Sequence, residues 1–211
     1  MTALLLLGGG GHCRAVIDVI EMTASAPKGP AWCVRGIVQP QEPGCATVLG
    51  YPVLGSDDEL ASLLADGADA LVTVGQIRTS SLRRRLYALL LGYGARLPVL
   101  VSPLAHVSRH AELGEGTVIM HGALVNAGAL IGVNGIVNSA ALIEHDVVVG
   151  DHVHVATGAR VNGGARLGSG CFVGSGAILH QGIQVGEDAV IAAGAVVRQD
   201  VPAGTIFRGC A

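Results

Sequence analysis

Aromatic residues are scarce in this sequence, at 3 % of its 211 residues, whereas glycine alone contributes 32 residues. Half of the chain is nevertheless hydrophobic. A core with so few large rings has to be layered from Val, Ile, Leu and Ala, and the many glycines indicate frequent tight turns between the layers.

Other absences narrow the possible functions. The net charge is −3 and no long run of Lys or Arg occurs, so the charge pattern does not favour nucleic acid as a partner. The five cysteines are scattered and form no CxxC pair, which favours reduced thiols in the cytoplasm over a disulfide framework. No apolar stretch approaches the ~20 residues that a membrane span requires. The short run from Ala3 to Leu7 is better explained as a buried first strand than as a signal peptide.

The C-terminal half has a strict period of six. Every sixth residue from Val101 to Val197 is Val, Ile or Leu, and the residue four places further on is mostly small, as at Ala105, Ala123 and Ala141. This period leaves no apolar stripe on an α-helix, so it excludes a helical reading. The pattern resembles the hexapeptide-repeat family, which implies a left-handed parallel β-helix with three sides and three hexads in each coil.

The N-terminal half alternates strands and helices. The hydrophobic pattern predicts strands at residues 3–7, 33–38, 70–74 and 97–101 and helices at residues 13–22, 57–64 and 80–91. Such alternation predicts a small Rossmann-like α/β domain over residues 1–100, followed by the β-helix domain over residues 101–211.

A glycine turn, Gly8-Gly9-Gly10-Gly11, separates the first predicted strand from the first helix. In α/β folds this is where backbone N–H groups and a helix N-terminus bind phosphate or a nucleotide. No acidic residue follows the second strand, where Gln39-Pro40-Gln41 stands instead. The turn therefore favours a mononucleotide over NAD, and a purely structural glycine turn remains the alternative.

Four segments carry a resemblance to one family: Gly10-Gly11-His12, Val74-Gly75-Gln76-Ile77-Arg78, Val137-Asn138-Ser139, and Ile143 to Asp151. Together with the order of the two domains, they resemble the sialic acid O-acetyltransferase-like group. This group includes the N-acetyltransferases of nucleotide-linked amino sugars. The resemblance implies an acetyl-CoA-dependent acyltransferase of glycan biosynthesis that N-acetylates such a sugar and holds no metal.

The resemblance also implies roles for individual residues. His145 would be the general base, Asp146 would raise its basicity, and His154 would contact acetyl-CoA. The other implied acetyl-CoA contacts are Gly163, Ser175, Ala193 and Gly194. The usual basic tail of the family is not present after Arg208, so we expect the coenzyme phosphate contacts to be weaker or to come from Arg198 and Arg208. The implied substrate contacts are Gly10, Gly11, His12 and Asn138.

The residue types at His145 and Asp146 suit acetyl transfer. A neutral His near pH 7 can take the proton of an attacking amine or hydroxyl, which typically contributes ~10²–10⁴-fold to the rate. An adjacent carboxylate favours the imidazolium form and orients the ring. For Asp146, a role in forming the turn competes with this catalytic one.

The repeat also constrains how the two histidines can meet. His145 and His154 are nine residues apart, which is half of a three-hexad coil. They should then lie on different sides of the prism and can share a pocket only if neighbouring subunits supply one each. This predicts a homotrimer with active sites at the subunit interfaces.

Three alternatives stay open. The acceptor could be a hydroxyl of sialic acid or a related sugar, which would make the protein an O-acetyltransferase. A zinc β-helix protein of the carbonic anhydrase type could use histidines such as His121, His145, His152 and His154 as ligands. The β-helix could also be a non-catalytic scaffold or sugar-nucleotide-binding module.

Overall fold

The computed structural model describes residues 2–25, 32–40 and 46–209. By their contacts, residues Met1–Gly75 and Leu82–Pro98 form one compact unit, and residues Gln76–Ser81 and Val99–Ala211 form a second. The short segment Gln76–Ser81 thus groups with the C-terminal half of the chain, although it lies between two elements of the N-terminal half.

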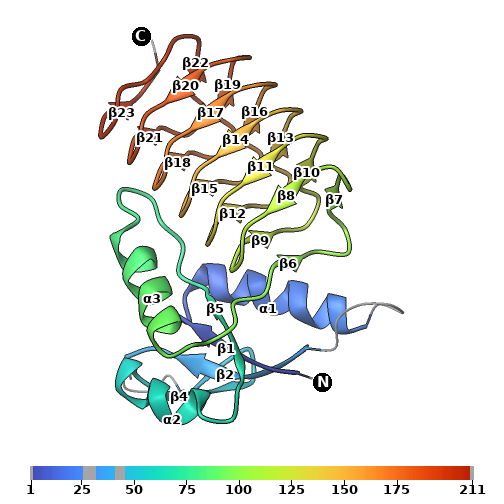
Figure 1. The fold of residues 1–211 in the computed structure, drawn as a ribbon, viewed down its shortest axis with the longest axis vertical. Helices are drawn as coiled ribbons and strands as arrows, with labels where there is room; N and C mark the ends of the chain where they lie inside the picture. Colours follow the sequence, from blue (N-terminus) through green and yellow to red (C-terminus); the bar gives the residue numbers. More distant parts are fainter. Residues whose placement is uncertain (1, 26–31, 41–45, 210–211) are drawn as a thin grey trace. The chain divides into compact units, whose positions relative to one another are not determined.

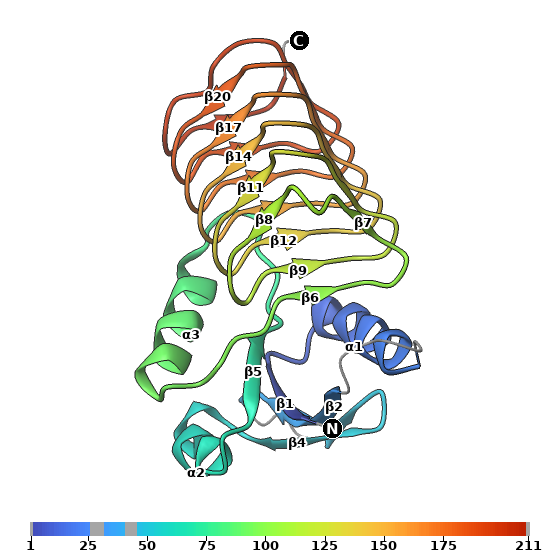
Figure 2. The same cartoon turned by 45° about the vertical axis from the view of Figure 1, so that its right-hand side comes forward.

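The first unit is a Rossmann-like α/β domain, as the sequence predicts. Its elements are β1 (Thr2–Leu7), α1 (Gly11–Ala24), β2 (Trp32–Val38), β3 (Thr47–Val48), β4 (Tyr51–Gly55), a 3₁₀ turn (Asp57–Glu59), α2 (Leu60–Leu64), β5 (Asp69–Val72) and α3 (Ser81–Gly92). The strand order is β3-β4-β2-β1-β5, and all pairs except β3–β4 are parallel. The connection from β1 to β2 through α1 and the connection from β4 to β5 through α2 run in opposite directions along the sheet. Right-handed crossovers therefore place α1 and α2 on opposite faces of the sheet (Figure 2).

Two details of this unit differ from the sequence predictions. The predicted strand 70–74 ends at Val72, although the Thr73 N–H still bonds to the carbonyl oxygen of Leu7. The predicted helix 57–64 begins as a 3₁₀ turn, where Ser56 and Glu59 form a capping box. The β3–β4 hairpin was not predicted.

The second unit is a parallel β-helix, in which coils stack along one axis (Figure 1). Its strands form three sheets. The first sheet holds β7 (His106–Val107), β10 (Leu124–Val125), β13 (Leu142–Ile143), β16 (Arg160–Val161), β19 (Ile178–Leu179) and β22 (Val196–Val197). The second holds β8 (Glu112–Leu113), β11 (Leu130–Ile131), β14 (Val148–Val149), β17 (Arg166–Leu167) and β20 (Gln184–Val185). The third holds β6 (Leu100–Val101), β9 (Val118–Ile119), β12 (Ile136–Val137), β15 (His154–Val155), β18 (Phe172–Val173), β21 (Val190–Ile191) and β23 (Ile206–Phe207).

The period of six explains this architecture. Each strand pairs in parallel with the strand 18 residues later, as Ile143 does with Val161. The second residue of each strand points inward, and the core is built from these aliphatic residues and the small residues four places further on. Burying such regular layers of Val, Ile, Leu and Ala stabilises the coil at roughly 25 cal/mol per Å² of apolar surface. The predicted strand 97–101 is shortened to β6, since each side of the coil accommodates only a two-residue strand.

The described residues also bear on membrane insertion and on the state of the cysteines. Within the described part of the chain, no helix is both long and apolar enough to cross a membrane. Cys13, Cys33 and Cys171 are free thiols, and Cys45 and Cys210 lie outside the described residues.

Candidate active site

His145 and Asp146 form a hydrogen-bonded pair at the corner between β13 and β14. The Nδ1 atom of His145 lies 2.9 Å from Oδ2 of Asp146. Asp146 has a φ of +60°, a left-handed conformation that Asp tolerates better than most residues. A proton on Nδ1 that is donated to the carboxylate leaves Nε2 as the nitrogen with the free lone pair. The pair therefore presents a basic Nε2 at an exposed corner.

The electrostatic surroundings strengthen this base. The hydrogen bond that His145 donates to Asp146 raises the pKa of His145 above its ordinary value, and the negative charges of Asp146 and Glu144 act in the same direction. Glu144 is held in place, because its Oε2 accepts hydrogen bonds from Asn126 Nδ2 at 2.9 Å and from the His145 N–H at 3.2 Å. Asn126 was not singled out from the sequence, although it precedes Glu144 by 18 residues, one coil.

Gly163 lies one coil after His145, in the same corner. A Cβ atom placed on Gly163 would come within 2.7 Å of both Cε1 and Nε2 of the imidazole. The neighbouring Gly164 N–H donates to the His145 carbonyl oxygen at 2.9 Å. The structure thus brings Gly163 directly against the ring of His145.

His154 lies on β15, in a different sheet, and only 7 % of it is exposed. Its Nδ1 atom is 3.0 Å from the carbonyl oxygen of Gln76, and its Nε2 atom is 3.3 Å from Asn138 Nδ2. The ring also packs edge-to-face against Phe172, with centroids 5.3 Å apart. The Gln76 N–H lies 3.4 Å from the same Nδ1. The shorter contact favours the tautomer in which Nδ1 donates to the Gln76 carbonyl and Nε2 accepts from Asn138.

Gln76 holds the ring of His154 in this arrangement. It belongs to a segment to which the sequence analysis assigned no role. Its side-chain amide donates to the carbonyl oxygens of Gly170 and Cys171, each at 3.1 Å. Further along, Ser80 Oγ lies 3.2 Å from Asp188 Oδ1. The segment 76–81 is therefore attached to the β-helix near both of its ends, and it delivers a carbonyl group to His154.

The prediction that His145 and His154 lie on different sides of the prism is confirmed. His145 follows β13 in the first sheet, and His154 belongs to β15 in the third. Of the predicted substrate contacts, Asn138 is brought to His154 and not to His145.

The predicted coenzyme residues of the later coils gather near the C-terminal end of the β-helix. The Gly194 N–H donates to the carbonyl oxygen of Ser175 at 2.8 Å. A hollow of about 280 Å³ is lined by Ala193, Gly194, Ala195, Val196, Arg198, Arg208 and Gly209. Two guanidinium groups in one hollow suit a ligand with negative charge.

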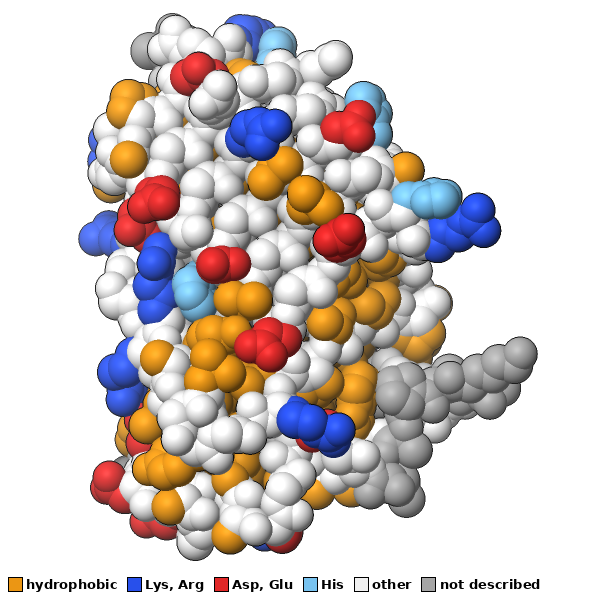
Figure 3. All heavy atoms as spheres, viewed as in Figure 1, with side chains coloured by type: hydrophobic (Ala, Val, Ile, Leu, Met, Phe, Trp, Pro, Cys, Tyr) orange, Lys and Arg blue, Asp and Glu red, His pale blue; other side chains and the backbone are white. Residues whose placement is uncertain are grey.

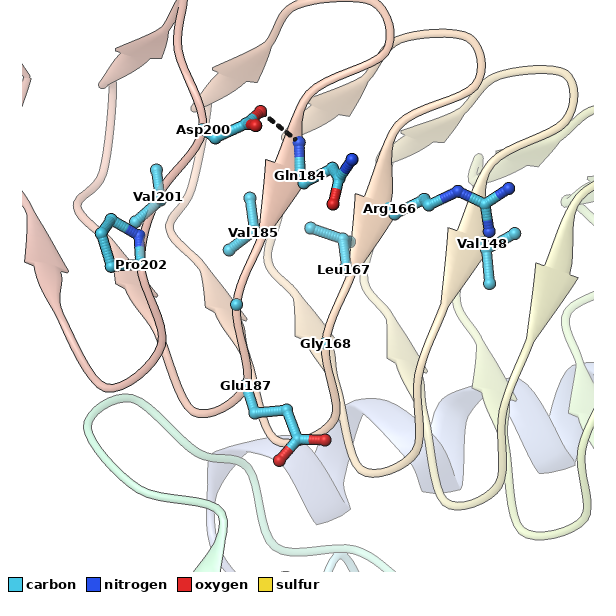
Figure 4. Close-up of a pocket in the computed structure, with 11 residues that line it drawn as sticks. Val148, Arg166, Leu167, Gly168, Gln184, Val185, Glu187, Asp200, Val201 and Pro202 are labelled. Atoms are coloured by element: carbon cyan, nitrogen blue, oxygen red, sulfur yellow. Dashed lines mark hydrogen bonds between the residues drawn. The ribbon is translucent and has the colours of Figure 1, made fainter.

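A larger groove of about 500 Å³ lies over β14, β17 and β20 (Figure 4). Arg166, Gln184 and Val148 come from successive coils, and the Asp200 carboxylate accepts a hydrogen bond from the Gln184 backbone N–H at 2.8 Å. Glu187 and Asp200 oppose the charge of Arg166, and none of the predicted site residues lines this groove. Size alone therefore does not identify the site.

The glycine turn of the first unit is closed at one end and open at the other. The Gly9 N–H donates to Gln39 Oε1 at 2.9 Å, and Thr73 Oγ1 donates to the carbonyl oxygen of Gly8 at 2.7 Å. Apart from the chain neighbours and the backbone of α1, no atom of the described residues lies within 4 Å of a Cβ built on Gly10 or Gly11. Helix α1 begins at Gly11 and has no side-chain cap, and His12 lies half-buried in its first turn. The open part of the turn is thus Gly10-Gly11, the two glycines expected to contact substrate.

A buried arginine fixes the end of β5. Arg83 is 1 % exposed, and its Nη1 atom donates to the carbonyl oxygens of Val74 and Val72. Burial lowers the pKa of this guanidinium to about 9. It remains charged near neutral pH, and it holds the point at which the chain leaves the sheet toward Gln76.

The four histidines considered as zinc ligands have separate partners. His121 lies 2.6 Å from Ser102 Oγ, His152 lies 3.0 Å from Asn134 Nδ2, and His145 and His154 have the partners given above. Within residues 2–25, 32–40 and 46–209, no group of three or more His, Cys, Asp or Glu residues is arranged to hold a metal ion.

Comparisons with known proteins identify the family of the chain. The PglD N-terminal domain family matches residues 3–90, and the bacterial transferase hexapeptide repeat matches residues 164–199. No curated protein sequence matches the chain. Among solved structures, the H→N mutant of perosamine N-acetyltransferase from Caulobacter crescentus, in complex with CoA and GDP-perosamine, is 31 % identical. The alignment covers 98 % of this chain and 93 % of that one, with a TM-score of 0.88.

Two further structures are similar. The acetyltransferase domain of PglB from Neisseria gonorrhoeae, in complex with acetyl coenzyme A, is 33 % identical over 97 % of this chain and 95 % of that one, with a TM-score of 0.86. WeeI from Acinetobacter baumannii is 25 % identical over 99 % of this chain and 97 % of that one, with a TM-score of 0.85.

A Rossmann-like domain joined to a hexapeptide β-helix with a His–Asp pair at one corner defines an acyltransferase of the hexapeptide-repeat class. Within that class, the chain belongs to the family of nucleotide-amino-sugar N-acetyltransferases. The enzyme class and fold predicted from the sequence are thereby confirmed.

Proposed function

We propose that this protein transfers the acetyl group of acetyl-CoA to the amino group of a nucleotide-linked amino sugar, with His145 as the general base. The observation that carries the proposal is the His145–Asp146 hydrogen bond, which leaves a basic Nε2 at an exposed corner of the β-helix. Similar solved structures bind CoA and GDP-perosamine or acetyl coenzyme A, which supports both substrates.

The chemistry follows from the geometry of the pair. As the sugar amine attacks the thioester carbonyl, a C–N bond forms and the amine loses a proton to Nε2 of His145. The tetrahedral intermediate then collapses, the C–S bond breaks, and the coenzyme leaves as its thiol after it receives a proton. Asp146 stabilises the imidazolium that exists between these steps.

The coenzyme would extend along the stack from His145 toward the hollow that contains Arg198 and Arg208. Three coils separate the corner of His145 from the corner of Arg198 and Gln199, which is about 14 Å at a strand spacing of ~4.8 Å. The two arginines would bind the coenzyme phosphates. Ala193 and Gly194, which line the same hollow, and the neighbouring Ser175 would contact the coenzyme at this end.

The nucleotide sugar would bind through the glycine turn of the first unit. The open positions Gly10 and Gly11 at the start of α1 leave room for a phosphate to approach the backbone. His12 lies in the same turn. Gln39, whose Oε1 is engaged by Gly9, stands where an acidic residue would recognise a ribose.

The site would be completed by a neighbouring copy of the chain in a homotrimer. His145 and His154 lie on different sheets, so one chain alone does not place them in one pocket. Leu124 and Leu142 on the outer face of the first sheet and Leu130 and Val148 on that of the second are half-buried or exposed, and they flank the corner of His145. Hydrophobic side chains are visible on the face that carries β8, β11 and β14 (Figure 3). An apolar stripe of this kind would pack against a second copy.

The decisive experiment compares wild type with His145→Asn. Thiol release would be followed with acetyl-CoA and a panel of UDP-, GDP- and dTDP-amino sugars beside free and CMP-linked sialic acid. We expect turnover with one amino sugar, and a loss of ~10²–10⁴-fold in kcat for the variant with coenzyme binding largely retained. Turnover only with the sialic acids would identify an O-acetyltransferase. Turnover of His145→Asn within about threefold of wild type would show that His145 is not the general base.

The proposed compartment is the cytoplasm. The free thiols of Cys13, Cys33 and Cys171 are the state expected in a reducing environment.

A further inference from the structure

We infer that Gly163 is a positioning residue for His145: its missing Cβ atom provides the space that the Nε2 edge of the imidazole occupies. The inference rests on the proposed role of His145 as the base. It assigns Gly163 a function in addition to the coenzyme contact implied by resemblance.

The sequence singles out this glycine. Gly163 is the third residue of its hexad, and the same corner carries Arg109, Ala127, His145, Gln181 and Gln199 in the other coils. Among all hexads from Val101 to Val197, this third position is occupied by glycine only at Gly163. The turn itself does not need a glycine there, because its φ lies outside the left-handed region and Ala127 occupies the equivalent position.

The geometry explains the exception. A Cβ on Gly163 would lie 2.7 Å from Cε1 and Nε2 of His145 and 3.3 Å from Cδ2. Carbon atoms in contact prefer separations of about 3.5–4.0 Å. The clash thus falls on the half of the ring that carries the reactive nitrogen. The other nitrogen, Nδ1, is held by Asp146.

A methyl group at this position would force the ring to move. Because Nδ1 is tethered to Asp146, the ring can escape only by rotating away from the carboxylate or by shifting the whole pair. Either movement displaces Nε2 by roughly 1 Å, and a misplacement of this size can reduce a rate by about 10²-fold.

The test is Gly163→Ala, with Arg109→Ala as the control in the same corner, two coils before His145. We expect kcat to fall 10- to 100-fold with the KM for acetyl-CoA within about threefold of wild type. The NMR titration of the His145 imidazole should shift to a lower pKa, because the hydrogen bond to Asp146 weakens. Arg109→Ala should match wild type in every measurement.

A double-mutant cycle tests the same contact without activity. Gly163→Ala should lower Tm when His145 is present, and the loss should disappear in the His145→Ala background, where no ring meets the added methyl group. An equal loss in both backgrounds would show that the glycine serves the coil alone, which overturns the inference.

The kinetic outcomes are equally distinct. A raised KM with unchanged kcat and an unchanged His145 titration would make Gly163 a coenzyme contact only and would overturn the positioning role. A shifted titration in Gly163→Ala, combined with full activity of His145→Asn, would uphold the positioning of the ring while refuting His145 as the base. The two proposals can therefore fail separately.

Discussion

The carbonyl oxygen of Gln76 accepts a hydrogen bond from Nδ1 of His154, a residue 78 positions later in the chain. This contact determines what His154 can do. In the tautomer with the proton on Nδ1, Nε2 accepts a hydrogen bond from Asn138 Nδ2 and has no proton to donate to an oxyanion. In this tautomer His154 is not suited to stabilising the tetrahedral intermediate of the proposed reaction.

Replacement of Gln76 with Glu should destabilise the segment that carries this carbonyl. The amide of Gln76 donates to the carbonyl oxygens of Gly170 and Cys171, and a carboxylate of the same shape has no proton to donate. We expect the free energy of unfolding to fall by about 1–3 kcal/mol, the cost of leaving buried acceptors unsatisfied. Calorimetry would measure this loss, and acetyl-CoA titration should show weaker binding. The exposed Thr79→Ala serves as the control, and equal behaviour of the two variants would contradict the role of Gln76.

Asp146→Asn should move the pH dependence of the reaction. Asp146 raises the pKa of His145, so the acidic limb of kcat/KM should lie above the ordinary histidine value of 6.5 in wild type. Without the carboxylate, His145 loses its proton at a lower pH. The acidic limb of kcat/KM should therefore shift to lower pH, and the maximal rate should fall. Asn tolerates the left-handed φ of position 146, so the turn is preserved. An unmoved limb would mean that another group titrates.

Arg198→Ala should weaken the binding of acetyl-CoA through its phosphates. Charge-assisted hydrogen bonds contribute about 1.5–3 kcal/mol, so we expect Kd to rise by about 10- to 100-fold. The comparison of acetyl-CoA with its 3′-dephospho form identifies the group involved: the difference between the two coenzymes should shrink in the variant. Arg160→Ala, on the exposed outer face of β16, provides a control of the same charge. If both variants bind alike, the hollow beside Ala193 is not a coenzyme site.

Leu142→Asp should dissociate the proposed homotrimer. Leu142 is half-buried on the outer face of β13, next to the corner of His145. A carboxylate placed in an apolar interface loses its hydration without gaining a partner. Sedimentation equilibrium should show a trimer for wild type and monomers for the variant, with loss of turnover. Leu104→Asp, at a separate exposed leucine, is the control. A monomer that retains full activity would contradict the inter-subunit site.

The β-helix could be predicted almost completely from the sequence, because every layer of its core repeats. The aliphatic residues from Ile119 to Val197 are buried as the period requires, and the offset of 18 residues between paired strands follows from three hexads per coil. The placement of His145 and His154 on different sides of the prism follows from the same repeat length.

Other features escaped prediction for physical reasons. The β3–β4 hairpin turns at Leu49-Gly50, with both residues at positive φ, and leucine is a poor signal for such a turn. The contact of Gln76 with His154 joins residues from distant parts of the chain, and no local pattern encodes it. Ser56 and Glu59, by contrast, follow the S-x-x-E capping pattern, which could have placed the start of that turn.

Because the strands pair in parallel at a fixed offset of 18 residues, the β-helix tolerates insertions only of whole coils. Insertion of one whole coil between Gly163 and Arg198 would preserve every face and corner while lengthening the stack by about 4.8 Å. An insertion of six residues would instead carry all later residues to the next side of the prism. Natural or engineered chains of this architecture should therefore vary in length by entire coils. A bound molecule that spans several coils would have to reach further for each coil that is added.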